Sequence, residues 1–346
     1  MLVDANIGGR VDGTSGGSFE TLRTQLDDIA DLGFDGVWTT EVGRDPFLPL
    51  LLAAEHLSNV SIGTAIAVAF ARNPMTMAAT AHDLQAFSGG RFVLGVGSQV
   101  KAHIERRFAM PWSEPAARME EFIGAMRAIW HAWDTGSTLN FEGRFYRHSL
   151  MTPMFVPDPH PWGPPPVLLA AVGPAMTKVA GRAADGLIVH SFTTERYLRE
   201  KTVTVIESEL LASGRTRADF TISLPGLVAT GQTEDEILAA REEVRRQLSF
   251  YGATPAYRGV LELHGWAELH TDLHRLSKEG QWHAMADLVD DEVLETFAVC
   301  GTPEQAGALA AERFASLVDR FTFYAPYPAS NATRRLFVEA ARTAQN

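Results

Sequence analysis

Two side chains that can move a proton each follow a short apolar segment of the sequence. Glu41 comes directly after Gly36 to Thr40, and His190 directly after Leu187 to Val189. A carboxylate close to a reacting carbon can exchange a proton with it, and an imidazole titrates near neutral pH. Both residues are therefore candidates for a proton-transfer group, with a solvated loop acid and a structural histidine as the alternatives.

A glycine-containing stretch, Arg91 to Gln99, could form the floor of a ligand site. Its apolar first half predicts a buried strand, which ends in Gly95 and Gly97. A strand that ends in glycine lets a ligand approach its backbone, and ligands of parallel α/β proteins lie at the carboxyl ends of the strands. Val100 stands where a dinucleotide fingerprint needs its third glycine. We therefore interpret the stretch as a barrel strand that leaves room for a flat ring, or as an ordinary strand and turn.

Two further stretches could bind an anion. Gly173 to Met176 follows an apolar segment and opens a helix, whose free amides suit a phosphate, although a simple helix start is the alternative. A basic cluster follows the glycine stretch and could bind the acidic arm of a cofactor or an anionic substrate. A solvated helix face, paired with Glu105 and Glu114, is its alternative. The cluster consists of Lys101, His103, Arg106 and Arg107.

These residues need a scaffold that brings strand ends together, and the chain alternates strand and helix patterns in the way a barrel does. The eight expected strands lie near residues 2–7, 36–40, 60–69, 91–97, 166–171, 187–190, 221–229 and 321–324. The sequence therefore predicts an α/β fold, a single (β/α)8 TIM barrel over residues 1–346. Its expected insertions are a proline-rich segment near 141–166, placed over the mouth (the carboxyl ends of the strands), and a charged helical region near 233–295. A glycine-rich loop is expected after the first strand, at 8–17.

Composition excludes several classes of partner. The net charge of −12 argues against nucleic acid or an anionic membrane surface. One cysteine, Cys300, excludes an intramolecular disulfide, and the histidines of the charged region match no common zinc spacing, so we expect no metal. We find neither a secretory signal at Met1 nor a bilayer-spanning apolar run, which predicts a cytoplasmic protein.

Several segments in order resemble the luciferase-like monooxygenase superfamily, and within it the branch that depends on the deazaflavin F420. The matching segments are Gly33 to Trp38, Ile62 to Ala67, Arg72 to Pro74, Gly90 to Ser98, Pro111-Trp112, Arg118 to Glu121, Ala170 to Pro174 and Ala180 to Gly186. The resemblance implies an eight-stranded barrel with the cofactor lying edge-in at the strand ends.

The resemblance also implies roles for single residues. The matched cofactor residues are Ala65 and Ile66, joined by a cis peptide, with Ala67 following; Gly97, Ser98 and Gln99 beside the ring, with Gln99 toward the substrate; and Gly173, Pro174, Ala175 and Met176 at the phosphate. Glu41 matches an acidic residue of several F420 enzymes. The sugar-phosphate dehydrogenases of this branch carry a histidine where this chain has Val42, and their next glutamate is absent near Gln99. This argues against sugar-phosphate oxidation and leaves the proton-transfer residue among Glu41, His190 and His103.

The resemblance predicts an F420-dependent oxidoreductase that moves a hydride between the deazaflavin and a small organic substrate, while the insertions exclude water. The first alternative is an FMN-dependent monooxygenase of the same superfamily. The second is a non-catalytic flavin-binding protein on the same barrel. A small molecule is the expected partner, and a homodimer is left open.

Overall fold

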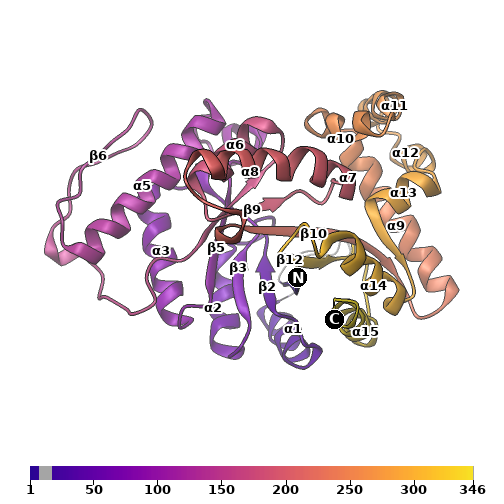
Figure 1. Cartoon of the computed structure of the whole chain (residues 1–346), viewed down its shortest axis with the longest axis horizontal. Helices are drawn as coiled ribbons and strands as arrows, with labels where there is room; N and C mark the ends of the chain where they lie inside the picture. The colour runs from indigo at the N-terminus through magenta and orange to yellow at the C-terminus, as the bar shows by residue number, and fades with distance from the viewer. Residues whose placement is uncertain (8–17, 346) are drawn as a thin grey trace.

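Parallel strands close into a barrel in the computed structural model, which describes residues 1–7 and 18–345 (Figure 1). Around the barrel the strands are β1 (Leu2–Ile7), β2 (Gly36–Thr39), β3 (Ser61–Thr64), β5 (Phe92–Gly97), β8 (Val167–Ala171), β9 (Gly186–Val189), β10 (Thr221–Thr230) and β12 (Arg320–Tyr324). β12 pairs with β1, and β10 pairs with both β9 and β12, so the ring is closed. The predicted (β/α)8 barrel is confirmed. The glycine-rich loop expected at 8–17 lies outside the described residues.

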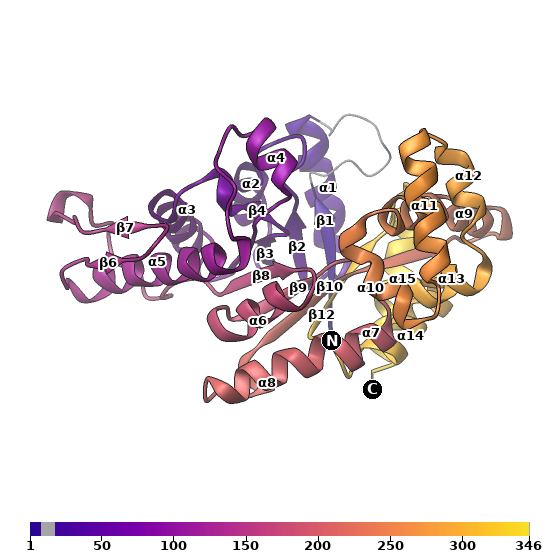
Figure 2. The same cartoon turned by 90° about the horizontal axis from the view of Figure 1, so that it is seen from above.

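Helices cover the outside of the barrel because each strand presents one buried face to them. They are α1 (Phe19–Leu32), α2 (Phe47–His56), α3 (Pro74–Phe87), α6 (Pro174–Ala183), α8 (Thr204–Ala212), α14 (Pro303–Phe314) and α15 (Asn331–Thr343). The expected caps of α1 are present: Ser18 accepts a hydrogen bond from the Thr21 N–H at 3.2 Å, and Gly33 has φ 78°. Figures 1 and 2 show the two termini side by side, where the Met1 amine donates to Gln345.

The segment between β5 and β8 carries the predicted proline-rich insertion. It contains α4 (Lys101–Arg106), α5 (Pro115–Thr135) and a hairpin of β6 (Phe141–Glu142) and β7 (Arg147–His148) that the sequence analysis did not predict. The hairpin folds back on α5, where the Glu121 carboxylate accepts from the N–H groups of Phe145 and Tyr146 at 2.6 Å.

The prediction that this insertion covers the mouth is wrong for residues 149–166. The Trp133 indole N–H donates to Met151, and the His160 ring lies 4.3 Å from that of His82 on α3. Trp162 packs on the Gly89 and Gly90 turn that leads into the amino end of β5, because glycine leaves room for its ring. This segment therefore packs on α3, α5 and the opposite end of the barrel, while Leu150, Met154 and Phe155 stay exposed.

The region predicted to be helical after β10 is helical. It consists of α9 (Glu234–Gly252), α10 (Arg258–Leu263), α11 (Ala267–Glu279), α12 (Trp282–Asp287) and α13 (Asp291–Phe297). Figure 2 shows these helices at one end of the molecule, with the β6–β7 hairpin at the other. An unpredicted strand, β11 (Ala298–Gly301), follows and pairs with β10 outside the ring. We call α9–α13 the helical insertion.

Two of its histidines satisfy backbone carbonyls. The Nδ1 atoms of His270 and His274 lie 2.7 and 2.9 Å from the carbonyl oxygens of Gly252 and Ala253, at the end of α9. Within residues 1–7 and 18–345, His, Cys, Asp and Glu form no group of three that could hold a metal ion. None of the helices the structure describes is long and apolar enough to cross a membrane.

Candidate functional site

At the carboxyl ends of the strands, several side chains of the described residues are only partly buried. Trp38, Leu168 and Ile188 form a buried apolar floor, and apolar residues on the neighbouring strand ends that pack against it are half-buried. A barrel filled to its rim would bury these positions completely, as its lower layers do. The half-buried residues above the floor are Ala65, Ile66 and Ala170. These partly buried residues at the carboxyl ends of the strands are where ligands of parallel α/β barrels lie.

One wall of the mouth is formed where β3, β5 and β8 meet. The peptide bond between Ala65 and Ile66 is cis, as the resemblance implied. A Cβ built on Gly97 would lie 3.0 Å from Ile66 Cδ1 and 3.5 Å from the Ala170 Cβ, so the missing side chain is what lets these residues meet. Ala67 is fully buried in β4 (Ala67–Val68), which pairs with β5.

The turn after β5 is held by its own side chains. Ser98 Oγ donates to the Gln99 carbonyl at 3.1 Å, and Gln99 Oε1 accepts from the Val100 N–H at 2.9 Å. Gln99 has φ 59°, in the left-handed region that few residues other than glycine adopt. Its side-chain oxygen is therefore engaged locally, and among residues 1–7 and 18–345 no hydrogen bond is made by its NH2 group.

Glu41 is buried and hydrogen-bonded to residues beside the wall. One oxygen, Oε2, accepts from the Val68 N–H at 2.7 Å and from Arg72 Nη1 at 2.6 Å. Arg72 also pairs with Asp45 at 2.9 Å. The alternative of a solvated loop acid is therefore wrong: Glu41 is buried, and its side chain connects the segment after the cis peptide to the end of β2.

The basic cluster after β5 lies on the surface of α4. Its members are exposed; Lys101 lies 3.8 Å from Glu105, and Arg107 donates to the Val42 carbonyl at 2.6 Å. Glu114, the other expected partner, pairs with Arg144 instead. This placement matches the alternative of a solvated helix face, and His103 is exposed with it.

A cavity of about 340 Å³ lies beside the mouth, between β9 and the start of α6. Gly173, Pro174 and Thr177 line one side, and Lys201 lines another. Gly173 has φ 78°, and α6 begins at Pro174 with Thr177 Oγ1 donating back to the Gly173 carbonyl at 2.9 Å. Ala175 and Met176 do not line the cavity: Ala175 is exposed, and Met176 packs on the main core. Of the four residues predicted to bind a phosphate, Gly173 and Pro174 therefore line the cavity.

His190 lines the same cavity and is held by two hydrogen bonds. Its Nδ1 accepts from the Phe192 N–H at 3.0 Å, and its Nε2 lies 3.0 Å from the Tyr257 hydroxyl. The ring stacks on Tyr257 at 4.3 Å and meets Tyr251 edge-on at 4.8 Å. Burial lowers the pKa of His190 to about 4, so it is neutral near pH 7.

The candidate proton-transfer residues are not brought together. Glu41 follows β2 and His190 follows β9, and these strands are separated by β3, β5 and β8 around the ring, so the two residues stand on opposite sides of the mouth. His103 is exposed on α4. Their roles stay predictions.

The sequence analysis missed several residues of the cavity. Thr193 follows the end of β9, so the rule that selected His190 could have found it. Lys201 belongs to a π-helical turn, Leu198–Val203, between α7 (Glu195–Tyr197) and α8, a local irregularity for which the sequence analysis found no signal. Tyr257 comes from the helical insertion, and only the tertiary structure brings it to β9.

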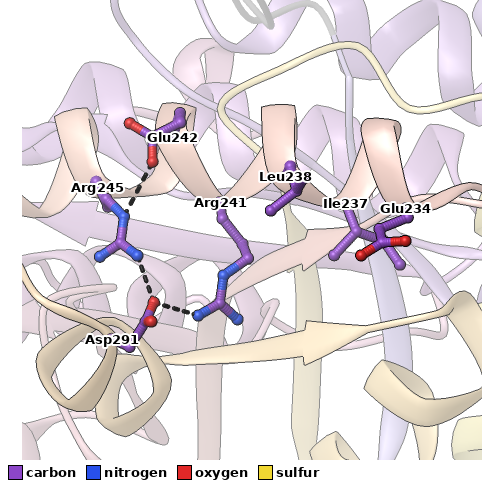
Figure 3. Close-up of a pocket in the computed structure, with 7 residues that line it drawn as sticks. All are labelled: Glu234, Ile237, Leu238, Arg241, Glu242, Arg245 and Asp291. Carbon is purple, nitrogen blue, oxygen red and sulfur yellow. Dashed lines mark hydrogen bonds and ion pairs between the residues drawn. The ribbon is translucent and has the colours of Figure 1, made fainter.

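A larger hollow of about 440 Å³ lies on the outer face of the helical insertion. Arg241 and Arg245 of α9 converge there on Asp291 (Figure 3). This hollow is lined by α9 and Asp291 and so lies apart from the strand ends. Its arginines are already paired, Arg241 with Asp291 and Arg245 with Glu242 and Asp291.

Comparisons with known proteins identify similar chains. A sequence profile described as "Luciferase-like monooxygenase" matches residues 3–320. An uncharacterized protein of Mycobacterium tuberculosis is 54% identical over 288 residues, 83% of this chain and 85% of that protein. An F420-dependent glucose-6-phosphate dehydrogenase of Intrasporangium calvum is 32% identical over 205 residues, 55% of this chain and 59% of that protein. The structure of the coenzyme F420-dependent tetrahydromethanopterin reductase of Methanopyrus kandleri superposes with a TM-score of 0.79 at 20% identity, over 98% of this chain and 97% of that one.

Proposed function

This chain belongs to the luciferase-like monooxygenase family, and on that premise we propose that it is an F420-dependent oxidoreductase that transfers a hydride between the deazaflavin and a small organic substrate. Of the two relatives reported above by sequence identity alone, one has a named activity, and that activity is F420-dependent. The observation that carries the proposal is the wall of Ile66, Gly97 and Ala170 over an apolar floor, because these residues offer an apolar surface at the strand ends on which a ring can lie.

The residues present fit a deazaflavin. A deazaflavin ring would be held against the apolar wall of Ile66, Gly97 and Ala170, where a Cβ on Gly97 would crowd Ile66. The adjoining cavity begins at the first turn of α6, where helix amides and the helix dipole favour a phosphate. When bound, the deazaflavin supplies the hydride-carrying carbon.

The chain's own residues shape the site in which the deazaflavin and the substrate would bind. Glu41 holds the backbone of Val68 and so keeps the wall in place. Gln99 presents its amide NH2 at the rim. His190 is neutral and offers no charge to the ring. The helical insertion packs on the β9 side of the mouth through Tyr257 and restricts the entry of water there.

The direct test is a fluorescence titration of the purified protein with F420 and, separately, with FMN. We expect saturable F420 binding that is at least about tenfold tighter than FMN binding. Tight FMN binding without F420 binding would identify an FMN-dependent monooxygenase and contradict the proposal.

A turnover assay separates the enzyme from a non-catalytic flavin-binding protein. The F420-loaded protein is mixed with alcohols, aldehydes and enones while the deazaflavin absorbance is followed. We expect a redox change with at least one class. F420 binding with no redox change in any class would favour the non-catalytic alternative.

A further inference from the structure

A pair of aromatic rings holds residues 149–165 on the outside of the barrel. The His82 ring of α3 meets the Trp133 ring of α5 edge-on, with their centroids 5.5 Å apart. His82 Nε2 donates to the Asp158 carbonyl at 3.2 Å, and the Trp133 indole N–H donates to Met151 Sδ at 3.4 Å. Within the described residues, these two are the hydrogen bonds that residues 149–165 make to other parts of the chain.

This stretch can separate from the barrel without opening the core. None of residues 149–164 is fully buried, and Met154 and Phe155 are 88% and 72% exposed. A surface segment with few buried apolar contacts opens locally at a lower free-energy cost than the core does. The contacts at the ring pair therefore largely decide whether residues 149–165 stay attached.

His160 packs on the ring pair in its neutral form. Its ring centroid lies 4.3 Å from that of His82, and its Nδ1 accepts from the Trp162 N–H at 3.3 Å. Because Nδ1 is the acceptor, the proton of the neutral ring is on Nε2. Nε2 is buried and has no hydrogen-bond partner within residues 1–7 and 18–345.

Protonation of His160 conflicts with each of these contacts. A proton on Nδ1 would face the Trp162 N–H, so that two donors would meet where an acceptor is needed. The positive charge would also lie beside His82 and would lose hydration. Asp134 of α5 favours the charged ring, yet burial and His82 together lower the pKa of His160 below its ordinary value. A detached ring in water has no such conflict, so detachment favours uptake of a proton.

We propose that His160, packed on His82, is a pH-dependent attachment point that holds residues 149–165 on α3 and α5 near neutral pH and releases them in mildly acidic solution. The rings lie on the outer helices and away from the strand ends, so the proposal does not rest on the proposed function.

Linkage gives the direction of the pH dependence. The pKa of His160 is lower in the attached state than the value of about 6.5 expected of the detached ring. Attachment is therefore fully stable above about pH 6.5 and weakens as the pH falls toward the lowered pKa. Uptake of one proton raises the ratio of detached to attached molecules by up to about tenfold between pH 7.5 and pH 5.5.

The test measures the distance between two spin labels in the full chain by pulsed electron paramagnetic resonance. The labels are attached to Ala79→Cys on α3 and Met154→Cys, both at exposed positions, in a Cys300→Ser background. Labelled protein is diluted with unlabelled protein, so that only distances within one chain are measured. We expect one narrow distance at pH 7.5. At pH 5.5 a broad population of longer distances should be up to about tenfold larger relative to the narrow one.

His160→Gln removes the titrating group. Its amide oxygen can still accept from the Trp162 N–H, and the side chain stays neutral at every pH, so we expect the distances to be independent of pH. His160→Phe keeps a flat ring that cannot be protonated, and it replaces His160→Gln if that variant is already detached at pH 7.5. His131→Gln is the matched control, because it makes the same change at an exposed histidine of α5 and should keep the pH profile of the parent protein.

Two results would overturn the proposal. The first is a distance distribution of the parent protein that is the same at pH 5.5 as at pH 7.5. The second is release at pH 5.5 that persists when His160 is replaced. His148 at the end of β7 also has a pKa lowered by burial, and it is kept in every variant, so persistent release would point to that residue instead. Circular dichroism at each pH shows that the barrel stays folded.

Discussion

A carboxylate at a strand end can serve chemistry or hold the backbone, and in Glu41 the second role is visible. Its Oε2 receives both the Val68 N–H and the Arg72 guanidinium, while Arg72 in turn reaches Asp45. Charge-assisted hydrogen bonds to a buried carboxylate are short and directional, so they fix the backbone they contact. The residue therefore stabilises the wall of the mouth whether or not it also exchanges a proton.

The variant Glu41→Gln tests this role. The amide keeps the shape but loses the charge, so the Arg72 guanidinium loses one of its two anionic partners. We expect the free energy of unfolding in urea to fall by about 1–3 kcal/mol. Glu195→Gln, which breaks the exposed pair with Arg199, is the control and should cost about 0.5 kcal/mol or less. Equal effects of the two changes would show that the Glu41 network is not structural.

At the scale of elements, the wall depends on how closely β3 and β5 approach. Gly95 and Gly97 face Thr64 and Ile66 respectively, and at Gly95 the neighbour is backbone, which cannot move away. At Gly97 the neighbour is the far end of the Ile66 side chain, which is half-buried and can move. The two glycines thus have different tasks: the first lets the strands pair, and the second sets the position of Ile66.

Gly97→Ala separates these tasks. The new methyl group would push the Ile66 side chain into the mouth, at a stability cost of about 1 kcal/mol, since a flexible side chain absorbs the contact. We expect F420 affinity, measured by fluorescence titration, to fall about tenfold. Gly43→Ala is the control, because a Cβ there meets no atom within 4 Å. Unchanged F420 binding by a folded Gly97→Ala protein would place the ring elsewhere.

At the scale of the whole molecule, a buried ion pair joins the first strand of the barrel, β1, to the last, β12. Arg320 of β12 donates through Nε and Nη2 to the two oxygens of Asp4 in β1, each at 2.7 Å, and the Trp38 indole N–H adds a third bond at 2.8 Å. Burial raises the pKa of Asp4, against the lowering effect of Arg320. The pair lies where the last strand closes on the first.

Arg320→Met tests the closure. It leaves a fully buried carboxylate without its cation, which costs about 3–5 kcal/mol near neutral pH. Without Arg320 the pKa of Asp4 rises further above its unfolded value, so folding takes up a proton and stability increases as the pH falls. In urea unfolding the deficit relative to the wild type should therefore be smaller at pH 5 than at pH 8. Arg275→Met, at an exposed pair, should show neither effect; a pH-independent deficit would contradict the assignment to Asp4.

The sequence determined the parts of this protein that depend on local pattern. Alternating apolar runs and caps such as Ser18 and Gly33 specify the strands and helices, and eight strands in one chain specify a closed barrel, because short right-handed crossovers leave few other arrangements. The spacing of residues at strand ends placed Gly97, Gly173 and His190 around the mouth and its adjoining cavity.

Only the tertiary structure decided which distant groups meet. The partner of Glu41 lies in the turn after β4, the partner of His190 comes from the helical insertion, and residues 149–166 pack on α3 and α5 instead of the mouth. Nothing in the local sequence fixes these contacts, since they depend on the packing of whole elements.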